Sequence, residues 1–197
     1  LEFRRVLFRS ALHGRRIGGH KLVAARLPTA FGESLRVLHK LLAANQPALV
    51  VCLGQAGGRS ALSLERVAIN IDDARIPDNQ GAQPVDQPVV AKGPPAYFST
   101  LPIKAMLRAM AHAGIAAEVS QTAGTFVCNH VFYGLMHALA TQKALRHTRG
   151  GFIHVPWLTG QGSPGMALDS MVHGLRVAVA TALATQGDIA LAAGAES

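Results

Sequence analysis

The chain is poor in aromatic and charged residues and contains only two cysteines. Of its 197 residues, 5% are aromatic, 15% are charged and 49% are hydrophobic. A composition with so little charge and so much apolar surface to bury excludes an intrinsically disordered protein. No apolar run approaches the roughly 20 residues that a membrane-spanning helix requires, so we expect no membrane partner. The length suits one well-cored domain.

Two cysteines are too few to form a disulfide framework. Cys52 lies within an apolar run at residues 49–53 and is predicted to be a small buried hydrophobe. Cys128 belongs to a different kind of site, so we expect no disulfide between the two in a reducing compartment. Residues 1–10 lack the long apolar core and the small-residue cleavage site of a secretory signal. We therefore expect a cytoplasmic protein.

The basic residues are scattered, although the formal net charge is +8. Residues 1–10 contribute +2 of this charge, from three arginines and one glutamate. The remainder forms no run and alternates with no aromatic residues that could stack on bases. Basic charge without such a pattern usually belongs to a solvated surface, so we expect no nucleic-acid partner.

Segments with strand patterns alternate with segments of helical apolar spacing. Strands are predicted at residues 21–27, 48–53, 66–71, 117–121 and 151–155. Helices are predicted at residues 31–46, 103–114, 126–141 and 166–186, with Ser99 as the capping residue of the second. This alternation indicates an α/β fold with a mostly parallel sheet covered on both faces and its site at the carboxyl ends of strands. Residues 72–95 and 159–165 resist regular structure, and loops as long as the first are often functional or bind partners.

The most informative segment is TAGTFVCNHVFYG at residues 122–134. It places Cys128 within the first two residues of a predicted helix, after a Gly/Thr turn. Unpaired backbone N–H groups and the positive end of the helix dipole favour the thiolate there. The same N–H groups can hold an oxyanion. Cys128 is therefore predicted to be a nucleophile.

A nucleophilic cysteine requires a base, and the chain offers nine histidines. His130 is two residues from Cys128 on the same helix, and side chains at that spacing do not face each other. His154 lies near the carboxyl end of the predicted strand 151–155, where it is either the base or a satisfied core histidine.

The group that orients the base is less obvious. Glu65 lies beside an apolar strand, where a surface charge or a helix-cap partner is the alternative interpretation. Asp72, Asp73 and Asp78 compete for the same role. Acidic loops without His or Cys at ligand spacing are weak evidence for a metal, so we expect none.

The glycine-rich segment GQAGG at residues 54–58 is not a phosphate loop, because it lacks the Lys-Ser/Thr pair and the spacing of G-x-G-x-x-G. Its glycines indicate a backbone that must approach a small ligand closely.

Six motifs, in order, resemble the pyroglutamyl-peptidase I family, also called pyrrolidone-carboxylate peptidases, in its bacterial form. They are residues 54–58 (GQAGG), 65–70 (ERVAIN), 74–79 (ARIPDN), 93–94 (GP), 120–130 (SQTAGTFVCNH) and 150–156 (GGFIHVP). The resemblance implies a single-domain three-layer α/β/α sandwich with a mostly parallel mixed sheet, a homotetramer and no cofactor. The implied reaction removes an N-terminal pyroglutamyl residue from peptides through a thioester acyl-enzyme.

The resemblance also assigns roles to individual residues. Cys128 is implied to be the nucleophile, His154 the general base and acid, and Glu65 the residue that orients the imidazole. Arg75 matches a family arginine near the scissile carbonyl, and the Cys128 N–H would contribute to the oxyanion hole. Gln55 and the backbone at Val127 match the family positions that hold the lactam ring.

The resemblance begins near Ala11, so we divide the chain into residues 1–10, an anomalous segment interpreted as foreign sequence, and the domain 11–197. Family members begin with a strand and a Gly-Phe-x-Pro-Phe-Gly-Gly loop, whose phenylalanines sandwich the lactam ring and which has no match here. Without that strand, the neighbouring strand would leave an apolar edge open. Residues 6–8 could form a replacement strand but could not supply the loop.

Two alternatives to an active pyroglutamyl peptidase follow. One is an inactive, truncated remnant that keeps the triad without the substrate loop. The other is a different Cys-His-Glu amide hydrolase, such as a glutamine amidotransferase. The second fits less well because Cys128 has no flanking G-x-C-x-G glycines and Glu65 precedes the cysteine.

Overall fold

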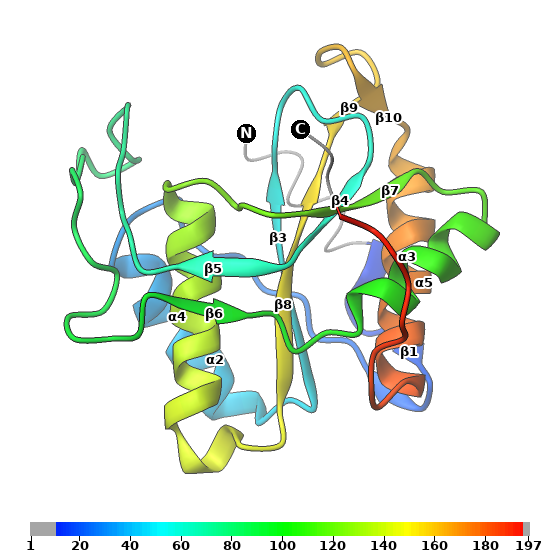
Figure 1. The fold of residues 1–197 in the computed structure, drawn as a ribbon, viewed down its shortest axis with the longest axis horizontal. Coiled ribbons are helices and arrows are strands. Elements are labelled where there is room, and N and C mark those ends of the chain that lie inside the picture. The colour runs from blue at the N-terminus through cyan, green and yellow to red at the C-terminus, as the bar shows by residue number, and fades with distance from the viewer. Residues whose placement is uncertain (1–10, 195–197) are drawn as a thin grey trace.

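A mixed sheet of four strands forms the centre of the molecule (Figure 1). The computed structural model describes residues 11–194. The strand order is β3 (Leu49–Gln55), β8 (Arg149–Val155), β4 (Leu62–Glu65) and β7 (Ala117–Ser120). The β3–β8 and β4–β7 pairs are parallel, and only the β4–β8 pair is antiparallel. The predicted mostly parallel sheet is confirmed.

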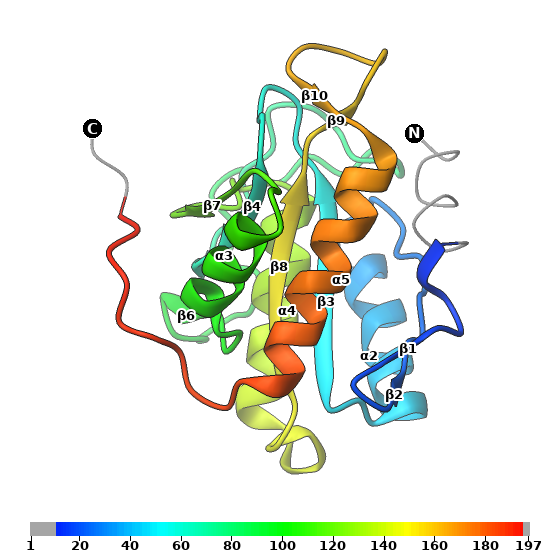
Figure 2. The ribbon, with the colours of Figure 1, turned by 90° about the vertical axis from the view of Figure 1, so that its right-hand side faces the viewer.

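Two helices cover each face of this sheet (Figure 2). Helices α2 (Glu33–Asn45) and α4 (Val127–Thr141) lie on one face, and α3 (Ile103–His112) and α5 (Leu168–Ala184) lie on the other. Each pair encloses its own hydrophobic cluster against the sheet. This is the predicted three-layer α/β/α sandwich. None of the helices within residues 11–194 has the length and apolar character needed to cross a membrane.

Shorter elements lie outside the central sheet. An antiparallel pair, β5 (Val67–Ile69) and β6 (Ala96–Phe98), contacts α4. The segment between them projects from the molecule (Figure 1) and is irregular, as the sequence predicts. The remaining short elements are β1 (Arg16–Ile17), β2 (His20–Lys21), β9 (Trp157–Leu158), β10 (Gly165–Met166) and the 3₁₀ turn η1 (Lys143–Leu145).

The alternation of side chains along the central strands decides which residues face α4. Leu64 on β4 and Ile153 on β8 pack into the cluster with α3 and α5. Residues one position away point to the opposite face of the sheet. Glu65 and His154 therefore face the layer that contains α4. The same alternation places Gly54 of β3 on this face, because Cys52 packs into the α2–α4 cluster.

The structure confirms most of the predicted elements and corrects the placement of one. All four helices, and the strands at 48–53, 117–121 and 151–155, lie where the apolar patterns predict them. The strand predicted at 66–71 exists as β5, but it pairs with β6 outside the central sheet. One strand has no predicted counterpart: β4, a four-residue strand that occupies an inner position of the sheet.

The prediction of a strand at residues 21–27 is wrong. Only Lys21 belongs to a strand, in the short β1–β2 hairpin, and residues 22–27 have no regular structure. The Leu22 backbone bonds to Gly14 and Arg15. An extended pattern becomes a strand only where a neighbour pairs with it, and within residues 11–194 β3 pairs with β8 alone. As expected for an edge strand, Leu53 is 39% exposed.

Residues 1–10, with the replacement strand considered for 6–8, lie outside the described residues.

The cap predicted for α3 is also wrong. Ser99 Oγ accepts from the Leu101 N–H, before the helix begins. Asp188, from the segment after α5, accepts instead from the N–H groups of Lys104 and Ala105 at 3.0 and 2.9 Å. A residue 83 positions away thus stabilises the helix N-terminus, and no local pattern could have shown it.

Substituting Asp188 with alanine should lower the free energy of unfolding by about 1 kcal/mol, the usual cost of losing a side-chain helix cap. Urea denaturation followed by circular dichroism measures this change. Asp188→Asn is the matched control, because it keeps an acceptor for the helix N–H groups and should lose less. Equal losses in the two variants would contradict the capping role.

Candidate active site

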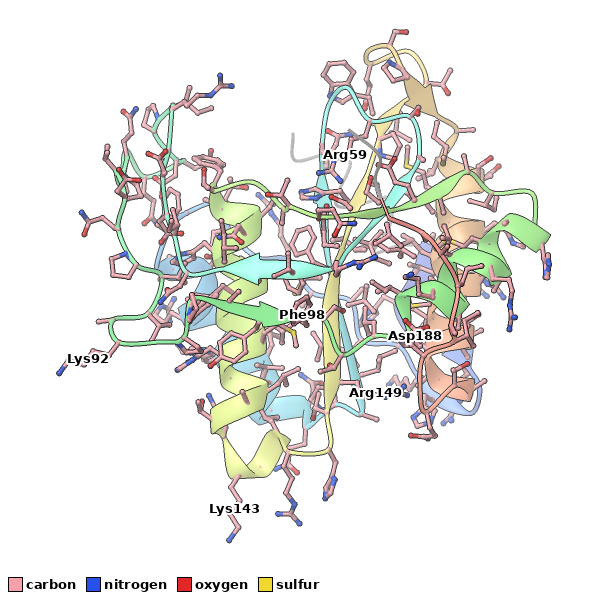
Figure 3. All side chains as sticks on the ribbon, in the orientation of Figure 1. Arg59, Lys92, Phe98, Lys143, Arg149 and Asp188 are labelled. Carbon is pink, nitrogen blue, oxygen red and sulfur yellow. The ribbon has the colours of Figure 1, made fainter. Side chains whose placement is uncertain are left out.

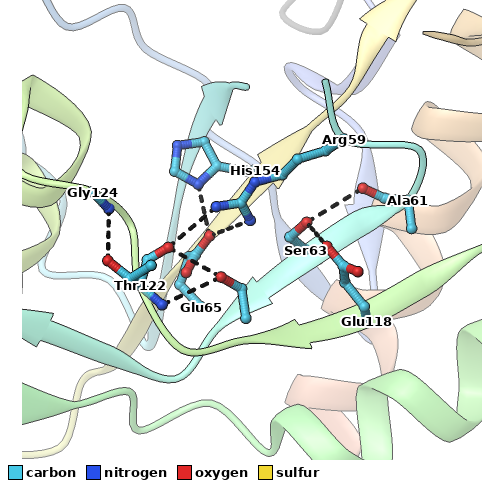
Figure 4. Close-up of polar contacts among 9 residues, drawn as sticks. Arg59, Ala61, Ser63, Glu65, Glu118, Thr122, Gly124 and His154 are labelled. Carbon is cyan, nitrogen blue, oxygen red and sulfur yellow. Dashed lines mark hydrogen bonds and ion pairs between the residues drawn. The ribbon is translucent and has the colours of Figure 1, made fainter. Parts of the chain in front are cut away.

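Glu65 and His154 form a buried pair across the antiparallel strands β4 and β8 (Figure 4). His154 Nδ1 and Glu65 Oε1 are 2.7 Å apart, and the residues are 3% and 0% exposed. Since a carboxylate only accepts hydrogen bonds, Nδ1 carries the proton and donates a hydrogen bond to Glu65. Nε2 of the neutral ring is then the nitrogen that can accept a proton from a substrate or a thiol.

Each of these residues lies near the carboxyl end of its own strand. The two strands run in opposite directions, because Ser63 is the register partner of His154 and Leu64 that of Ile153. Glu65 therefore lies diagonally across from His154 on the same face of the sheet. The expected location at strand ends is correct, but an antiparallel pair creates the contact rather than adjacent parallel strands.

Cys128 is the second residue of α4, as the sequence predicts. Its thiol lies against the backbone of β3, where a Cβ added to Gly54 would be 2.8 Å from Cys128 Sγ. Gly54 is the register partner of His154 in the parallel β3–β8 pair. The Phe152 ring approaches the same point and lies 4.8 Å from the His154 ring, centroid to centroid. The strands therefore bring Glu65, His154 and the Cys128 thiol to one region of the α4 face.

The second cysteine has a different environment. Cys52 is buried, and both cysteines are thiols. Burial, with a smaller contribution from the nearby Cys128, raises the pKa of the Cys52 thiol to about 12. Cys52 therefore remains a neutral hydrophobe, as predicted.

His130 belongs to a second buried histidine–aspartate pair. Its Nε2 accepts from the Gly32 N–H at 3.0 Å, so Nδ1 carries the proton and donates to Asp72 Oδ2 at 2.7 Å. Both ring nitrogens are thus used in joining α4 to the segments before α2 and after β5. This arrangement agrees with the exclusion of His130 as the base. It also commits Asp72, one of the competing carboxylates, to another partner.

The other two aspartates also contact loop backbone instead of His154. Asp78 accepts from the N–H groups of Phe31, Gln80 and Ala82. Burial favours a higher pKa for the Asp78 carboxyl, but these backbone donors, with that of Gly81, outweigh it and lower the pKa. The Asp73 backbone bonds twice to Thr125. Thr125 precedes Cys128 by three positions, so this contact ties the segment after β5 to the start of α4.

The remaining predicted site residues are Arg75, Gln55 and Val127. Arg75 is exposed, two residues beyond Asp73. No hydrogen bond or ion pair within residues 11–194 joins Arg75 to Glu65 or His154. Gln55 ends β3 and donates to the Pro156 carbonyl at 3.3 Å, and Val127 is the first residue of α4 and is buried.

The glycines of residues 54–58 are approached by the protein's own side chains. The Cys128 thiol and the Phe152 ring contact Gly54, and a Cβ on Gly57 would lie 2.3 Å from the Trp157 ring. The requirement for glycine therefore arises at both positions without a ligand. Across residues 11–194, no group of three or more His, Cys, Asp or Glu side chains could hold a metal ion.

Arg59, which was not among the predicted site residues, contacts the same carboxylate as His154. Arg59 Nη1 donates to Glu65 Oε1 at 2.8 Å. Figure 3 shows it near the ends of β3 and β4, whereas Lys92 and Lys143 extend from the periphery. In the sequence, its position directly after the GQAGG segment is the feature that could have pointed to Arg59.

The two thiols should differ sharply in reactivity. With its pKa near 12, Cys52 has almost no thiolate at pH 8. Iodoacetamide should therefore modify Cys128 alone in the native protein and both cysteines in urea. Peptide mass spectrometry measures the two sites, and modification of Cys52 at the rate of Cys128 under native conditions would contradict this prediction.

Substituting Gly54 with alanine should slow alkylation of Cys128 and lower stability by about 1–3 kcal/mol, because the added methyl group overlaps the thiol and the Phe152 ring. Alkylation rates and thermal denaturation measure both effects. Gly187→Ala is the control, since a Cβ there meets nothing within 4 Å. An unchanged alkylation rate in Gly54→Ala would mean that the reactivity of the Cys128 thiol does not depend on its contact with Gly54.

The sequence is similar to those of known peptidases. The chain is 59% identical over 184 residues to the pyrrolidone-carboxylate peptidase of Cupriavidus taiwanensis, covering 91% of this chain and 85% of the relative. It is 58% identical over 191 residues to that of Erwinia tasmaniensis, covering 94% and 88%.

Solved structures show the same fold. The pyroglutamyl peptidase I of Bacillus amyloliquefaciens superposes with a TM-score of 0.90 at 42% identity, over 94% of this chain and 89% of that one. A variant pyrrolidone carboxyl peptidase of Pyrococcus furiosus gives 0.85 at 38% identity, over 90% and 88%. The family model of the pyroglutamyl peptidases matches residues 6–185. The resemblance seen in the six motifs is therefore confirmed, and this chain belongs to the pyroglutamyl peptidase family.

Proposed function

We propose that this protein is a cysteine exopeptidase that removes N-terminal pyroglutamate from peptides. The observation that carries the proposal is the buried His154–Glu65 hydrogen bond on the sheet face that the Cys128 thiol also contacts. Such a set supplies a nucleophile, a base and a group that orients the base. Its membership of the pyroglutamyl peptidase family indicates the substrate class.

In the first step, the Cys128 sulfur attacks the carbonyl carbon that links the pyroglutamyl residue to the next residue. His154 Nε2 takes the thiol proton and then gives it to the departing amine. Glu65 holds the ring in the tautomer with Nδ1 protonated. The backbone N–H of Cys128, at the start of α4, stabilises the oxyanion.

Departure of the amine leaves a thioester between Cys128 and the pyroglutamyl group. Water then attacks the thioester carbon while His154 Nε2 accepts its proton, and the Cys128 sulfur leaves. The products are free pyroglutamate and a peptide with a new N-terminal amine. No step requires a cofactor.

Three further residues complete the proposed site. Arg75 is assigned to the region of the scissile carbonyl. In support, Asp73, two residues before Arg75, forms two hydrogen bonds with Thr125, which precedes Cys128 by three positions. Gln55, at the end of β3, and the Val127 backbone, next to Cys128, are assigned to the lactam ring. A neutral lactam needs only an apolar pocket with a few hydrogen bonds.

We also propose that residues 11–197 form a single domain, that the protein assembles as a homotetramer and that it acts in the cytoplasm. Exposed apolar side chains on the segment between β5 and β6 and on β6 itself support assembly: Ile76, Val85 and Phe98 are 64%, 63% and 70% exposed. The two thiols suit a reducing compartment.

Hydrolysis of a pyroglutamyl-aminocoumarin substrate tests the proposed function. Cys128→Ser and His154→Ala should each lower kcat by at least about 10⁴-fold, and Glu65→Gln by about 10²- to 10⁴-fold, because the three act as one unit. Cys52→Ala is the control and should remain active. Undiminished hydrolysis by Cys128→Ser, or no hydrolysis by a folded wild-type protein, would sink the proposal. Release of ammonia from glutamine would instead indicate an amidotransferase-type hydrolase.

A further inference from the structure

Arg59 contacts the buried Glu65–His154 pair and has no role in the reaction described above. We propose that Arg59 is a positioning residue that holds the Glu65 carboxylate in place for His154 and connects it to the turn before Cys128. The inference rests on the proposed function, because it concerns the same triad.

The contacts converge on one oxygen atom. Glu65 Oε1 accepts from Arg59 Nη1 at 2.8 Å and from His154 Nδ1 at 2.7 Å, whereas Oε2 is buried without a hydrogen-bond partner among the described residues. Two donors on the same oxygen restrain its position, so Arg59 fixes the acceptor that in turn orients His154.

Charge gives Arg59 a second effect on the pair. Glu65 is fully buried, and a buried carboxylate without a compensating charge is costly. His154 supplies a charge only when it is protonated, whereas the Arg59 guanidinium is always charged. Its side chain is 23% exposed, so it reaches the carboxylate from the surface loop between β3 and β4.

The second guanidinium contact reaches the other half of the site. Arg59 Nη2 donates to the Thr122 carbonyl at 3.1 Å, across 63 positions of sequence (Figure 4). Thr122 Oγ1 accepts from the Gly124 N–H at 3.0 Å, which closes the turn that leads into α4. One side chain therefore joins the strand that carries Glu65 to the turn before the Cys128 helix.

The test compares Arg59→Gln and Arg59→Lys with Arg36→Ala, which removes an exposed arginine–glutamate pair on α2. Arg59→Gln should lower kcat by about 10- to 100-fold, the scale of a small misplacement of a reacting group, with little change in KM. Arg59→Lys should restore part of kcat, since it keeps the charge but not the contacts of both guanidinium nitrogens.

A double variant separates positioning from general destabilisation. If Arg59 acts through Glu65, adding Arg59→Gln to a Glu65→Gln variant should lower kcat little further. Kinetics like those of Arg36→Ala, or fully additive losses in kcat, would each overturn the inference. Thermal denaturation of every variant shows that the protein remains folded. If triad variants stay active, the proposed function itself fails, whereas inactive triad variants with unaffected Arg59 variants reject only the role of Arg59.

Discussion

The buried contact between Glu65 and His154 is the constraint on which the candidate site depends. Glu65 ends a four-residue strand and has no exposure to water, so its carboxylate must find partners inside the protein. One partner, His154, is present because β8 pairs with β4, and β8 also pairs with β3 on its other side. The same central strand therefore places His154 beside Glu65 and opposite Gly54, against which the Cys128 thiol packs.

The first turn of α4 supports this arrangement through three consecutive residues with different contacts. Cys128 meets β3, whereas Asn129 bonds to both the N–H and the carbonyl of Ile69 on β5. His130 bonds to Asp72 and to the Gly32 backbone. Successive helix side chains point about 100° apart, so one turn can hold the Cys128 thiol while two buried neighbours fasten it to separate segments.

Local patterns predicted the elements whose formation depends on local patterns. The four helices and the strands β3, β7 and β8 followed from hydrophobic spacing, and Cys128 followed from its place at a helix start. The strand predicted at residues 21–27 was wrong because a strand also needs a partner, which no local pattern reveals. The cap from Asp188 and the contacts of Arg59 were missed for a related reason, since each joins segments far apart in the chain.

The sequence by itself determined the chemical character of the site: a thiol at a helix N-terminus, a histidine near a strand end and motifs shared with one peptidase family. It could not decide which of nine histidines meets which of eleven acidic residues. Only the tertiary structure decided this, pairing His154 with Glu65 across 89 positions and His130 with Asp72 across 58. The physical reason is that strand register and helix placement set these distances, and both arise from packing of the whole core rather than from any neighbouring residues.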